Sequence, residues 1–228
     1  MELKDIFLKN NIEVTERQLQ QFELYADLLV EWNEKFNLTS ITDREDIYVK
    51  HFQDSLLPCI YYDLKGSLAD VGTGAGFPGI PLKIIDPDLE VTLVEPTGKR
   101  CTFLNEVIRQ LGLEKITVIN KRSEDYARDN VRFDFVTARA VAELNILSEL
   151  CMPLVKLNGH FIVMKGPKAY QELETAARAI KTLGGTVREI REISLSEDQT
   201  RVLIDIQKTS EHNPKYPRNY SQIKKKPL

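Results

Sequence analysis

The stretch SLADVGTGAGFPG, residues 67–79, decides the fold, because a short apolar run passes directly into a loop rich in glycine. Glycine has no Cβ, so it allows a tight turn and lets the backbone approach a ligand closely. In open α/β sheets, ligands bind outside the carboxyl ends of the strands. The stretch therefore predicts a strand over residues 67–72, then a ligand-binding turn, then the start of a helix within FPGIPLKII.

Strand-like and helix-like segments alternate on the C-terminal side of this loop. Further strands are predicted at residues 90–95, 116–121, 133–138 and 160–165, and helical segments at residues 99–112, 123–128, 144–154 and 169–183. Such alternation predicts a doubly wound, mostly parallel α/β sheet with right-handed crossovers. Two β-rich runs at residues 186–194 and 201–208 have a short connection, so one of them should run antiparallel. The predicted ligand-binding domain spans residues 66–208.

Residues 1–65 have a different, helical pattern and predict an N-terminal helical extension. A capping box at Thr15 predicts a helix start, and apolar residues then recur every three or four positions. A second capping box at Thr42 predicts a helix that runs through His51. Pro58 is expected to kink or restart that helix, because proline cannot complete the helical hydrogen-bond ladder. Neither helix can bury its apolar stripe alone, so both should pack on the following domain.

Two carboxylates flank the glycine loop and narrow the choice of ligand. Asp70 lies at the end of the first strand, where a carboxylate repels a pyrophosphate but suits the ammonium group of a methionine moiety. Glu95 ends the second strand, where a carboxylate can accept both hydroxyls of an adenosine ribose; a solvated strand end is the alternative. Phe77 takes the place of the third glycine of the dinucleotide fingerprint. With Gly72 and Gly74 shaping the turn, these residues favour S-adenosylmethionine over a nicotinamide dinucleotide.

The residues TARAV at the end of the fourth strand, from Thr137, bear on which atom receives the methyl group. Methyltransferases that modify exocyclic amines resemble one another in an Asn/Asp-Pro-Pro-aromatic motif at this place, which this chain lacks. Cytosine-C5 enzymes need a nucleophilic cysteine, and Cys151 lies in an apolar run that favours a core position. A ring nitrogen such as guanine N7 has a lone pair and no proton, so its methylation needs positioning but no general base. The absence of an obvious acid–base pair fits that reaction, and it fits many others.

Composition limits the classes of function. The chain has 228 residues, 42% of them hydrophobic and 29% charged, as in an ordinary globular protein with a sizeable core. No apolar run approaches the roughly 20 residues that cross a bilayer, and the N-terminus lacks a signal-like core, so a cytoplasmic protein without membrane contact is expected. Cys59, Cys101 and Cys151 are far apart with no His at ligand spacing, so no metal site is predicted. Nothing demands a dimer, and a monomer is expected.

The net charge of −3 hides a basic C-terminal tail, residues 209–228. From Lys208 onward, six Lys or Arg residues stand against a single acid, Glu211. Such a tail is either solvated and mobile or an arm that contacts phosphate groups. In the second case, Tyr216 and Tyr220 are available as stacking partners for bases.

Five short motifs occur together in the order found in one family. They are Asn37-Leu38-Thr39-Ser40, His51 with Asp54-Ser55, DVGTGAGFPGIPL from Asp70, GKR at 98–100 and TARAVA at 137–142. Together these motifs closely resemble the ribosomal small-subunit methyltransferase G family, also called glucose-inhibited division protein B, and the resemblance runs from the first helix to the last strand. The resemblance implies a class I (Rossmann-like) methyltransferase fold. It also implies transfer of a methyl group from S-adenosylmethionine to N7 of a guanine in the decoding-site loop of 16S ribosomal RNA, with the small ribosomal subunit as partner.

The resemblance also implies roles for individual residues. Gly72 and Phe77 match contacts of the cofactor loop. Ser123 and Glu124 match the place after the third strand that approaches the adenine, although Ser123 departs mildly from the small aliphatic residue usual there. Arg139 matches an arginine on the cofactor side, with a structural salt bridge as the alternative.

No catalytic residue is assigned, and Arg139 and Lys165 are the candidates. The candidate contacts to RNA are Asn37, His51, Arg122, Lys165, Lys215 and Arg218. Each has a structural alternative: His51 could simply pack, Arg122 could cover the sheet, and Lys165 could be an exposed strand end.

Two other functions fit part of the pattern. A methyltransferase that acts on a small molecule or a protein would have the same glycine loop, and a requirement for assembled ribosomal subunits would distinguish the two. The second class is a nicotinamide dehydrogenase or a protein that binds the cofactor without chemistry. Phe77 and Asp70 argue against the dehydrogenase, and cofactor binding without methyl transfer would favour the binding protein.

Overall fold

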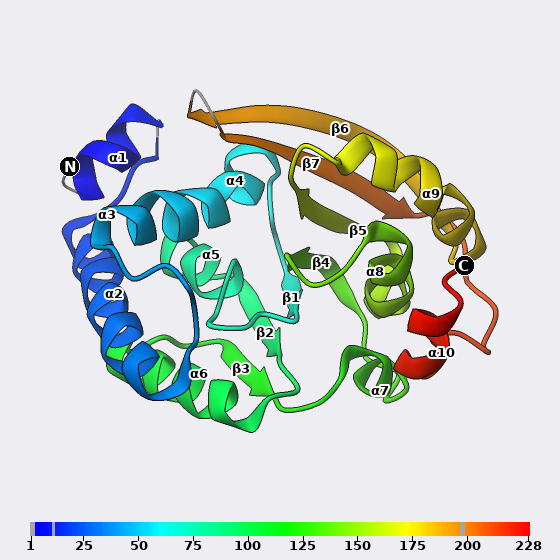
Figure 1. The fold of residues 1–228 in the computed structure, drawn as a ribbon, viewed down its shortest axis with the longest axis horizontal. Coiled ribbons are helices and arrows are strands. Elements are labelled where there is room, and N and C mark those ends of the chain that lie inside the picture. The colour runs from blue at the N-terminus through cyan, green and yellow to red at the C-terminus, as the bar shows by residue number, and fades with distance from the viewer. Residues whose placement is uncertain (1–2, 11, 197–198) are drawn as a thin grey trace.

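The protein is built around one mixed sheet, which the computed structural model describes over residues 3–10, 12–196 and 199–228. The seven strands have the order β3-β2-β1-β4-β5-β7-β6 (Figure 1). They are β1 Ser67–Val71, β2 Glu90–Val94, β3 Ile116–Ile119, β4 Phe133–Arg139, β5 Val155–Lys165, β6 Gly185–Ser196 and β7 Gln199–Lys208. Strands β1 to β5 pair in parallel, whereas β7 is antiparallel to both β5 and β6. The predicted doubly wound, mostly parallel sheet with one antiparallel C-terminal strand is confirmed.

Helices cover both faces of the sheet. They are α1 Leu3–Lys9, α2 Glu16–Phe36, α3 Arg44–Asp46, the π-helix η1 Ile47–Gln53, α4 Asp54–Tyr61, α5 Gly79–Ile85, α6 Gly98–Leu111, α7 Ser123–Ala127, α8 Leu144–Cys151, the 3-10 helix η2 Met152–Leu154, α9 Ala169–Thr182 and α10 Tyr220–Lys225. On β1, Leu68 belongs to the apolar core shared with the N-terminal helices, α5 and α6, whereas Ala69 and Val71 belong to the core shared with α8 and α9. Because alternate strand residues face opposite sides, the two cores lie on the two faces of the sheet.

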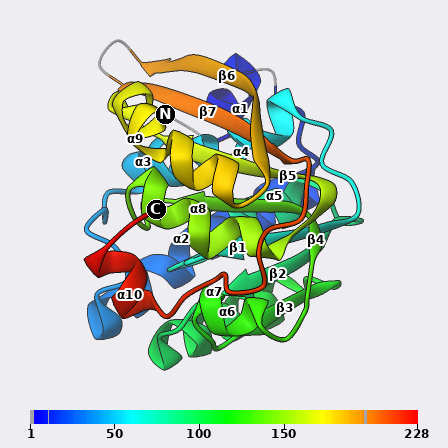
Figure 2. The same ribbon diagram turned by 90° about the vertical axis from the view of Figure 1, so that its right-hand side faces the viewer.

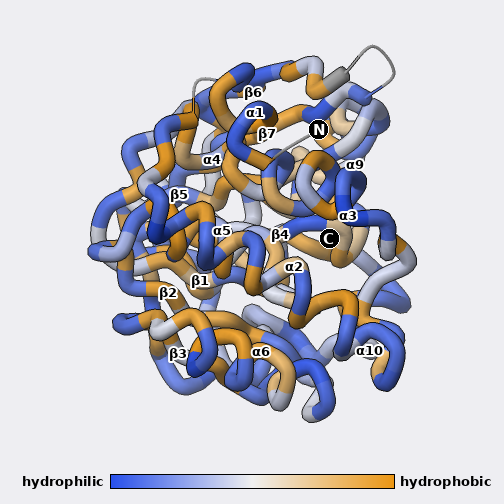
Figure 3. Tube along the Cα trace, turned by 90° about the vertical axis from the view of Figure 1, so that its left-hand side faces the viewer, coloured by the Kyte–Doolittle hydropathy of each residue, from blue (hydrophilic) through white to orange (hydrophobic). Residues whose placement is uncertain are grey.

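The helical extension packs on the sheet domain as predicted. Helix α2 begins at the Thr15 capping box, in which the Thr15 hydroxyl accepts a hydrogen bond from the backbone N of Gln18 at 3.3 Å. Hydrophobic and hydrophilic residues alternate along α2 (Figure 3). Its buried side chains include Phe22 and Tyr25, both with no exposed area. The helix therefore contributes one apolar face to the core over α5 and α6.

The second predicted helix start is wrong by one residue. Asp43, rather than Thr42, is the N-cap, and its carboxylate accepts a hydrogen bond from the backbone N of Asp46 at 3.0 Å. A negative charge is favoured at that position because of the helix dipole. The helix continues through His51 as predicted, but in a π conformation. It does not restart at Pro58, which lies inside α4, because proline removes a single hydrogen bond and the buried apolar side chains of α4 hold the turn.

Three other features differ from the sequence-based expectations. Helix α1 was not predicted, and β5 begins at Val155 rather than residue 160. Of the two alternatives for the tail, a wholly solvated and mobile segment does not agree with the structure. The chain after β7 runs back along the molecule to α10, which lies beside α8 (Figure 2). Tyr216 is 9% exposed and Ile223 is fully buried, so the tail is anchored by apolar contacts.

Candidate functional site

The glycine loop leaves the carboxyl end of β1 as predicted. Gly72 and Gly74 have positive φ angles of 67° and 63°, a conformation that residues with a Cβ rarely adopt. The backbone N of Gly72 also donates a hydrogen bond to the carbonyl of Val94, at 2.8 Å. A Cβ on Gly72 would lie 2.7 Å from the side chain of Val141. Glycine is therefore required at position 72 both by the turn and by the segment that follows β4.

Asp70 is fully buried and holds the glycine loop in place. Its Oδ2 accepts hydrogen bonds from the backbone N of Gly79 at 2.8 Å and from the Thr73 hydroxyl at 2.5 Å. Burial raises the pKa of Asp70 to about 6, despite these hydrogen bonds. Within the described part of the chain, Oδ1 is buried and has no hydrogen-bond partner. A buried carboxylate oxygen without a partner favours a cationic or donor group.

Glu95 follows β2 and points into the same region. Its side chain is 2% exposed, so the alternative of a solvated strand end is wrong. The two carboxylate oxygens accept hydrogen bonds from the backbone N of Gly74 at 3.1 Å and of Thr97 at 2.8 Å. Arg100 lies 3.7 Å away. Each oxygen retains a second lone pair, so the carboxylate can accept further donors.

A cavity of about 170 Å³ lies where these elements meet, and we call it the loop cavity. It is lined by Val71, Gly72, Val94, Pro96, Arg122, Ser123, Glu124, Val141, Leu150 and Tyr220. Ser123 and Glu124 are both buried at the start of α7. Of the predicted cofactor residues, Gly72, Ser123 and Glu124 line this cavity, whereas Asp70 and Glu95 are buried at the strand ends next to it.

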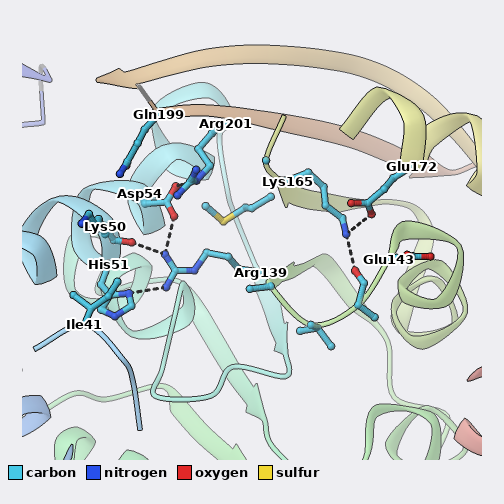
Figure 4. Close-up of a pocket in the computed structure, with 15 residues that line it drawn as sticks. Ile41, Lys50, His51, Asp54, Arg139, Glu143, Lys165, Glu172, Gln199 and Arg201 are labelled. Atoms are coloured by element: carbon cyan, nitrogen blue, oxygen red, sulfur yellow. Dashed lines mark hydrogen bonds and ion pairs between the residues drawn. The ribbon is translucent and has the colours of Figure 1, made fainter. Parts of the chain in front are cut away.

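A second cavity, of about 610 Å³, lies beyond the end of β4, and we call it the arginine cavity. Its lining includes Lys50, His51, Asp54, Arg139, Lys165 and Arg201 (Figure 4). Val141 lines both cavities. The cavities therefore adjoin at the segment 140–143, which we call the partition.

Arg139 is the centre of a buried polar network on one wall of the arginine cavity. Its Nη1 donates to Asp54 Oδ2 at 2.8 Å and to the carbonyl of Lys50 at 3.1 Å, and its Nη2 lies 3.2 Å from His51 Nδ1 (Figure 4). Arg201 Nε binds the other oxygen of Asp54 at 2.9 Å. Asp54 is 1% exposed and so depends on both arginines for its charge balance. The network thus connects α4 with the strands β4 and β7.

His51 and Phe77 form a stacked pair behind this network. Their ring centroids are 4.4 Å apart with an interplanar angle of 11°. Phe77 also stacks on Tyr25 at 5.4 Å, and the Arg139 guanidinium lies 5.2 Å from its ring. The Phe77 side chain thus packs inside the protein and supports His51 and Arg139. Thr39 is 2.9 Å from the remaining ring nitrogen of His51, so both nitrogens are engaged.

We expect His51 to make the protein less stable in acid. Burial, together with the charge of Arg139, lowers the pKa of His51 to about 3. The unfolded chain takes up a proton below pH ~6.5, whereas the folded state does not. The stability linked to His51 is therefore complete above pH ~6.5 and is lost as the pH falls, by about 2–3 kcal/mol between pH ~6.5 and ~4.5. Urea unfolding should show a shallower pH dependence for His51→Gln than for the wild type. Equal slopes would contradict a buried, neutral His51.

Lys165 fixes the partition. Its Nζ donates to the carbonyl of Ala142 at 2.6 Å and pairs with Glu172 at 2.7 Å. The Lys165 side chain is 10% exposed, so it is not the exposed strand end considered as an alternative. Ala140 has a φ of 57°, which costs on the order of 1 kcal/mol for a residue with a Cβ. The partition is thus a constrained turn that Lys165 ties to α9.

The remaining candidates lie apart from the arginine cavity. Arg122 caps α7 and lines the loop cavity. Asn37 is exposed at the C-cap of α2 with a φ of 49°. Lys215 is exposed, with its ammonium group 5.1 Å from the Tyr216 ring. Arg218 binds Glu149, whose side chain is fully buried, at 2.6 Å. RNA contact by these residues stays a prediction.

Sequence reasoning assigned no cavity role to several of the lining residues, among them Asp54, Arg201, Val141 and Tyr220. Asp54 stood in a quoted motif without a role, and Arg201 and Val141 were not singled out. Tyr220 was considered only as a partner for RNA bases. Asp54 could have been found from its place one helical turn after His51 on the same face; nothing local marks Arg201.

No helix in residues 3–10, 12–196 and 199–228 is long and apolar enough to cross a membrane. In the same ranges, no group of three His, Cys, Asp or Glu side chains is placed to hold a metal ion.

Comparison of whole structures identifies the fold. The ribosomal protein L11 methylase from Lactobacillus delbrueckii subsp. bulgaricus aligns with a TM-score of 0.53 at 18% identity, covering 72% of this chain and 79% of that one. NSun6 from Pyrococcus horikoshii, solved with SFG, aligns with a TM-score of 0.57 at 9% identity, covering 70% and 52%. These neighbours confirm the class I methyltransferase fold.

Comparison of sequences identifies the family. The family model GidB, described as rRNA small subunit methyltransferase G, matches residues 18–202. A ribosomal RNA small subunit methyltransferase G from Staphylococcus epidermidis is 48% identical over 99% of this chain and 97% of its own length. One from Staphylococcus aureus is 49% identical over 96% and 94%. With the motifs in order and the cavities at the ends of the same strands, the chain belongs to the rRNA small subunit methyltransferase G family.

Proposed function

We propose that the protein transfers a methyl group from S-adenosylmethionine to N7 of a guanine in the decoding-site loop of 16S ribosomal RNA. The observation that carries this proposal is the pair of cavities at the strand ends, which share Val141 as a lining residue. We assign the adenosyl part of the cofactor to the loop cavity and the base to the arginine cavity. The bacterial small subunit is cytoplasmic, so the proposal places the protein in the cytoplasm, as a monomer that needs no metal.

Residues in and beside the loop cavity support binding of the cofactor. Asp70 Oδ1 is a buried acceptor with no partner in the described chain, which suits an ammonium group. Glu95 has lone pairs left for the ribose hydroxyls. Ser123 and Glu124 line the loop cavity at the start of α7, and we assign them to the adenine. When bound, the cofactor supplies an electrophilic methyl group on its sulfonium.

The arginine cavity offers positioning groups and a poor general base. His51 is the side chain whose ordinary pKa suits that role best. It is neutral, and Arg139 and Thr39 occupy its two ring nitrogens. Because Arg139 can only donate, His51 Nδ1 accepts, and the ring proton lies on Nε2 facing Thr39. This arrangement suits a nucleophile such as guanine N7, which has no proton to lose, so the protein need only hold it in line.

The charges in the arginine cavity are complementary to guanine. Guanine presents the O6 acceptor beside N7, which arginine and lysine recognise in nucleic acids. Lys50, Arg139 and Lys165 line the cavity as donors. Glu143 and Glu172 line it as acceptors, which the N–H groups on the opposite edge of guanine require. The cavity thus contains donors for the O6 edge of guanine and acceptors for its N–H edge.

The test is transfer of labelled methyl groups from S-adenosylmethionine to purified small ribosomal subunits. Subunits from a strain that lacks the gene should take up label as 7-methylguanosine at one loop position. Subunits from the wild-type strain, already modified, are the control and should take up almost none. Naked 16S RNA, other small molecules and ribosomal proteins are tested in parallel. Cofactor binding without label in any RNA would contradict the proposed acceptor.

A further inference from the structure

We propose that the C-terminal segment completes the cofactor site, with the ring of Tyr220 forming the wall of the loop cavity that contacts the adenosyl group. This inference rests on the proposed function, because it takes S-adenosylmethionine as the occupant of that cavity. It gives the basic tail a role in binding the cofactor, in addition to any contact with RNA.

The position of Tyr220 is the first observation. Tyr220 is the first residue of α10, and it lines the loop cavity together with Pro96 and Ser123 from the two strand ends that the adenosyl group requires. Figure 1 shows α10 beside α7, at the carboxyl-end side of the sheet. The rest of the lining comes from residues between 71 and 150. Among the residues that line the loop cavity, Tyr220 is thus the aromatic one, and it comes from the tail.

The anchoring of the segment is the second observation, because it fixes Tyr220 in place. Arg218 donates to Glu149 from its backbone N at 2.9 Å and from its guanidinium at 2.6 Å. Glu149 is fully buried in α8. Arg128 at the end of α7 donates to the Asn219 side chain at 2.8 Å. Ile223, one turn after Tyr220, is fully buried. The contacts lie on both sides of Tyr220 along the chain.

The chemistry of the wall is the third observation. The guanidinium of Arg122 lies 5.3 Å from the centroid of the Tyr220 ring and lines the same cavity. An aromatic ring with an arginine against it provides a planar, polarisable surface, on which purine rings stack. Pro96 and Leu150 supply apolar surface in the same cavity. A purine fits this wall better than a phosphate would, because the wall is largely apolar and the Glu124 carboxylate in the same lining would repel a phosphate.

The test is calorimetric titration of S-adenosylhomocysteine into the full-length protein and into Tyr220→Ala. Loss of one stacking partner should raise the Kd about tenfold or more. Tyr220→Phe keeps the ring and should bind within about twofold of the wild type. Lys224→Ala lies on the same helix, exposed and outside the cavity lining, and should leave the Kd unchanged. Tyr220→Leu, which keeps an apolar anchor for α10, should weaken binding like the alanine variant.

The outcomes separate this inference from the proposed function. If wild type binds S-adenosylhomocysteine and Tyr220→Ala and Tyr220→Leu bind it equally well, Tyr220 has no role in the cofactor site. If both variants bind the cofactor normally but small subunits weakly, the tail is an RNA arm and the inference is overturned. If the wild type itself binds neither S-adenosylhomocysteine nor S-adenosylmethionine, the proposed function fails at the cofactor. Thermal unfolding of every variant checks that the tail is still folded.

Discussion

Replacing Arg139 by alanine is expected to lower the rate of methyl transfer to small ribosomal subunits by about a hundredfold or more. Arg139 joins Asp54, the Lys50 carbonyl and His51 on one wall of the arginine cavity. Without Arg139, the guanine that we propose as substrate would lose a cationic donor, and the wall of the arginine cavity would lose the contacts that hold it together. A displacement of about 1 Å between reacting atoms can cost on the order of a hundredfold in rate. Single-turnover transfer to subunits from the deficient strain measures this directly.

Two variants test whether the effect belongs to Arg139 itself. Arg139→Lys retains the charge but cannot make the forked contacts to three partners, so its rate should stay at least tenfold below wild type. Arg201→Gln is the matched control, because Arg201 binds the same Asp54 carboxylate but from its other side. Its rate should fall by less than about tenfold. If Arg139→Ala loses S-adenosylhomocysteine binding instead, the arginine acts on the cofactor side. A near-normal rate in Arg139→Ala would remove Arg139 from the mechanism.

Replacing Arg218 by alanine is expected to lower the free energy of unfolding by about 2–3 kcal/mol. Glu149 has no exposed area and Arg218 is its ion-pair partner, with 23% of the arginine side chain exposed. Removing one partner of a buried pair costs about 3–5 kcal/mol, because the other charge stays buried without compensation. The backbone N of Arg218 still donates to Glu149 in the variant, which places the cost below that range. Urea unfolding at neutral pH measures it.

The difference in exposure between the side chains of Arg218 and Glu149 provides the control. Glu149→Gln should cost less than Arg218→Ala, because the arginine it leaves behind can reach water whereas the glutamate cannot. The double variant Glu149→Leu with Arg218→Met should recover most of the stability. Arg128→Ala, whose side chain is 42% exposed, should change stability by less than about 1 kcal/mol. If Arg218→Ala is as stable as wild type but binds subunits weakly, Arg218 contacts RNA as the sequence suggested.

Most of the fold could be predicted because its signals are local. The alternation of apolar runs with helical segments located the strands, and the glycines marked the turn after β1, since both depend on near neighbours in the chain. The N-cap at Asp43 was misplaced because Thr42 and Asp43 are both good caps and sequence alone does not choose between them. The π-helix Ile47–Gln53 has no local signal, since its hydrogen-bond spacing depends on the packing around it.

The positions of the residues predicted to bind the cofactor could be located from the sequence, whereas the wall of the arginine cavity could not. The former lie at strand ends, whose place in a doubly wound sheet follows from topology. The wall of the arginine cavity comes instead from pairs such as Arg139 with Asp54 and Arg201 with Asp54, which are 85 and 147 residues apart. The pairing of Arg218 in the tail with the buried Glu149 could not be predicted for the same reason. Such pairings exist only after folding and leave no spacing to detect.

The network at Asp54 also sets the order in which the protein can mature during its own synthesis. Asp54 leaves the ribosome early, Arg139 later, and Arg201 only when β7 is made. Glu149 likewise has to wait for Arg218, near the end of the chain. Burial of either carboxylate before its arginine has been translated would leave a charge without a partner. The arginine cavity needs the chain as far as Arg201, whereas the loop cavity is complete only when Tyr220 has been made.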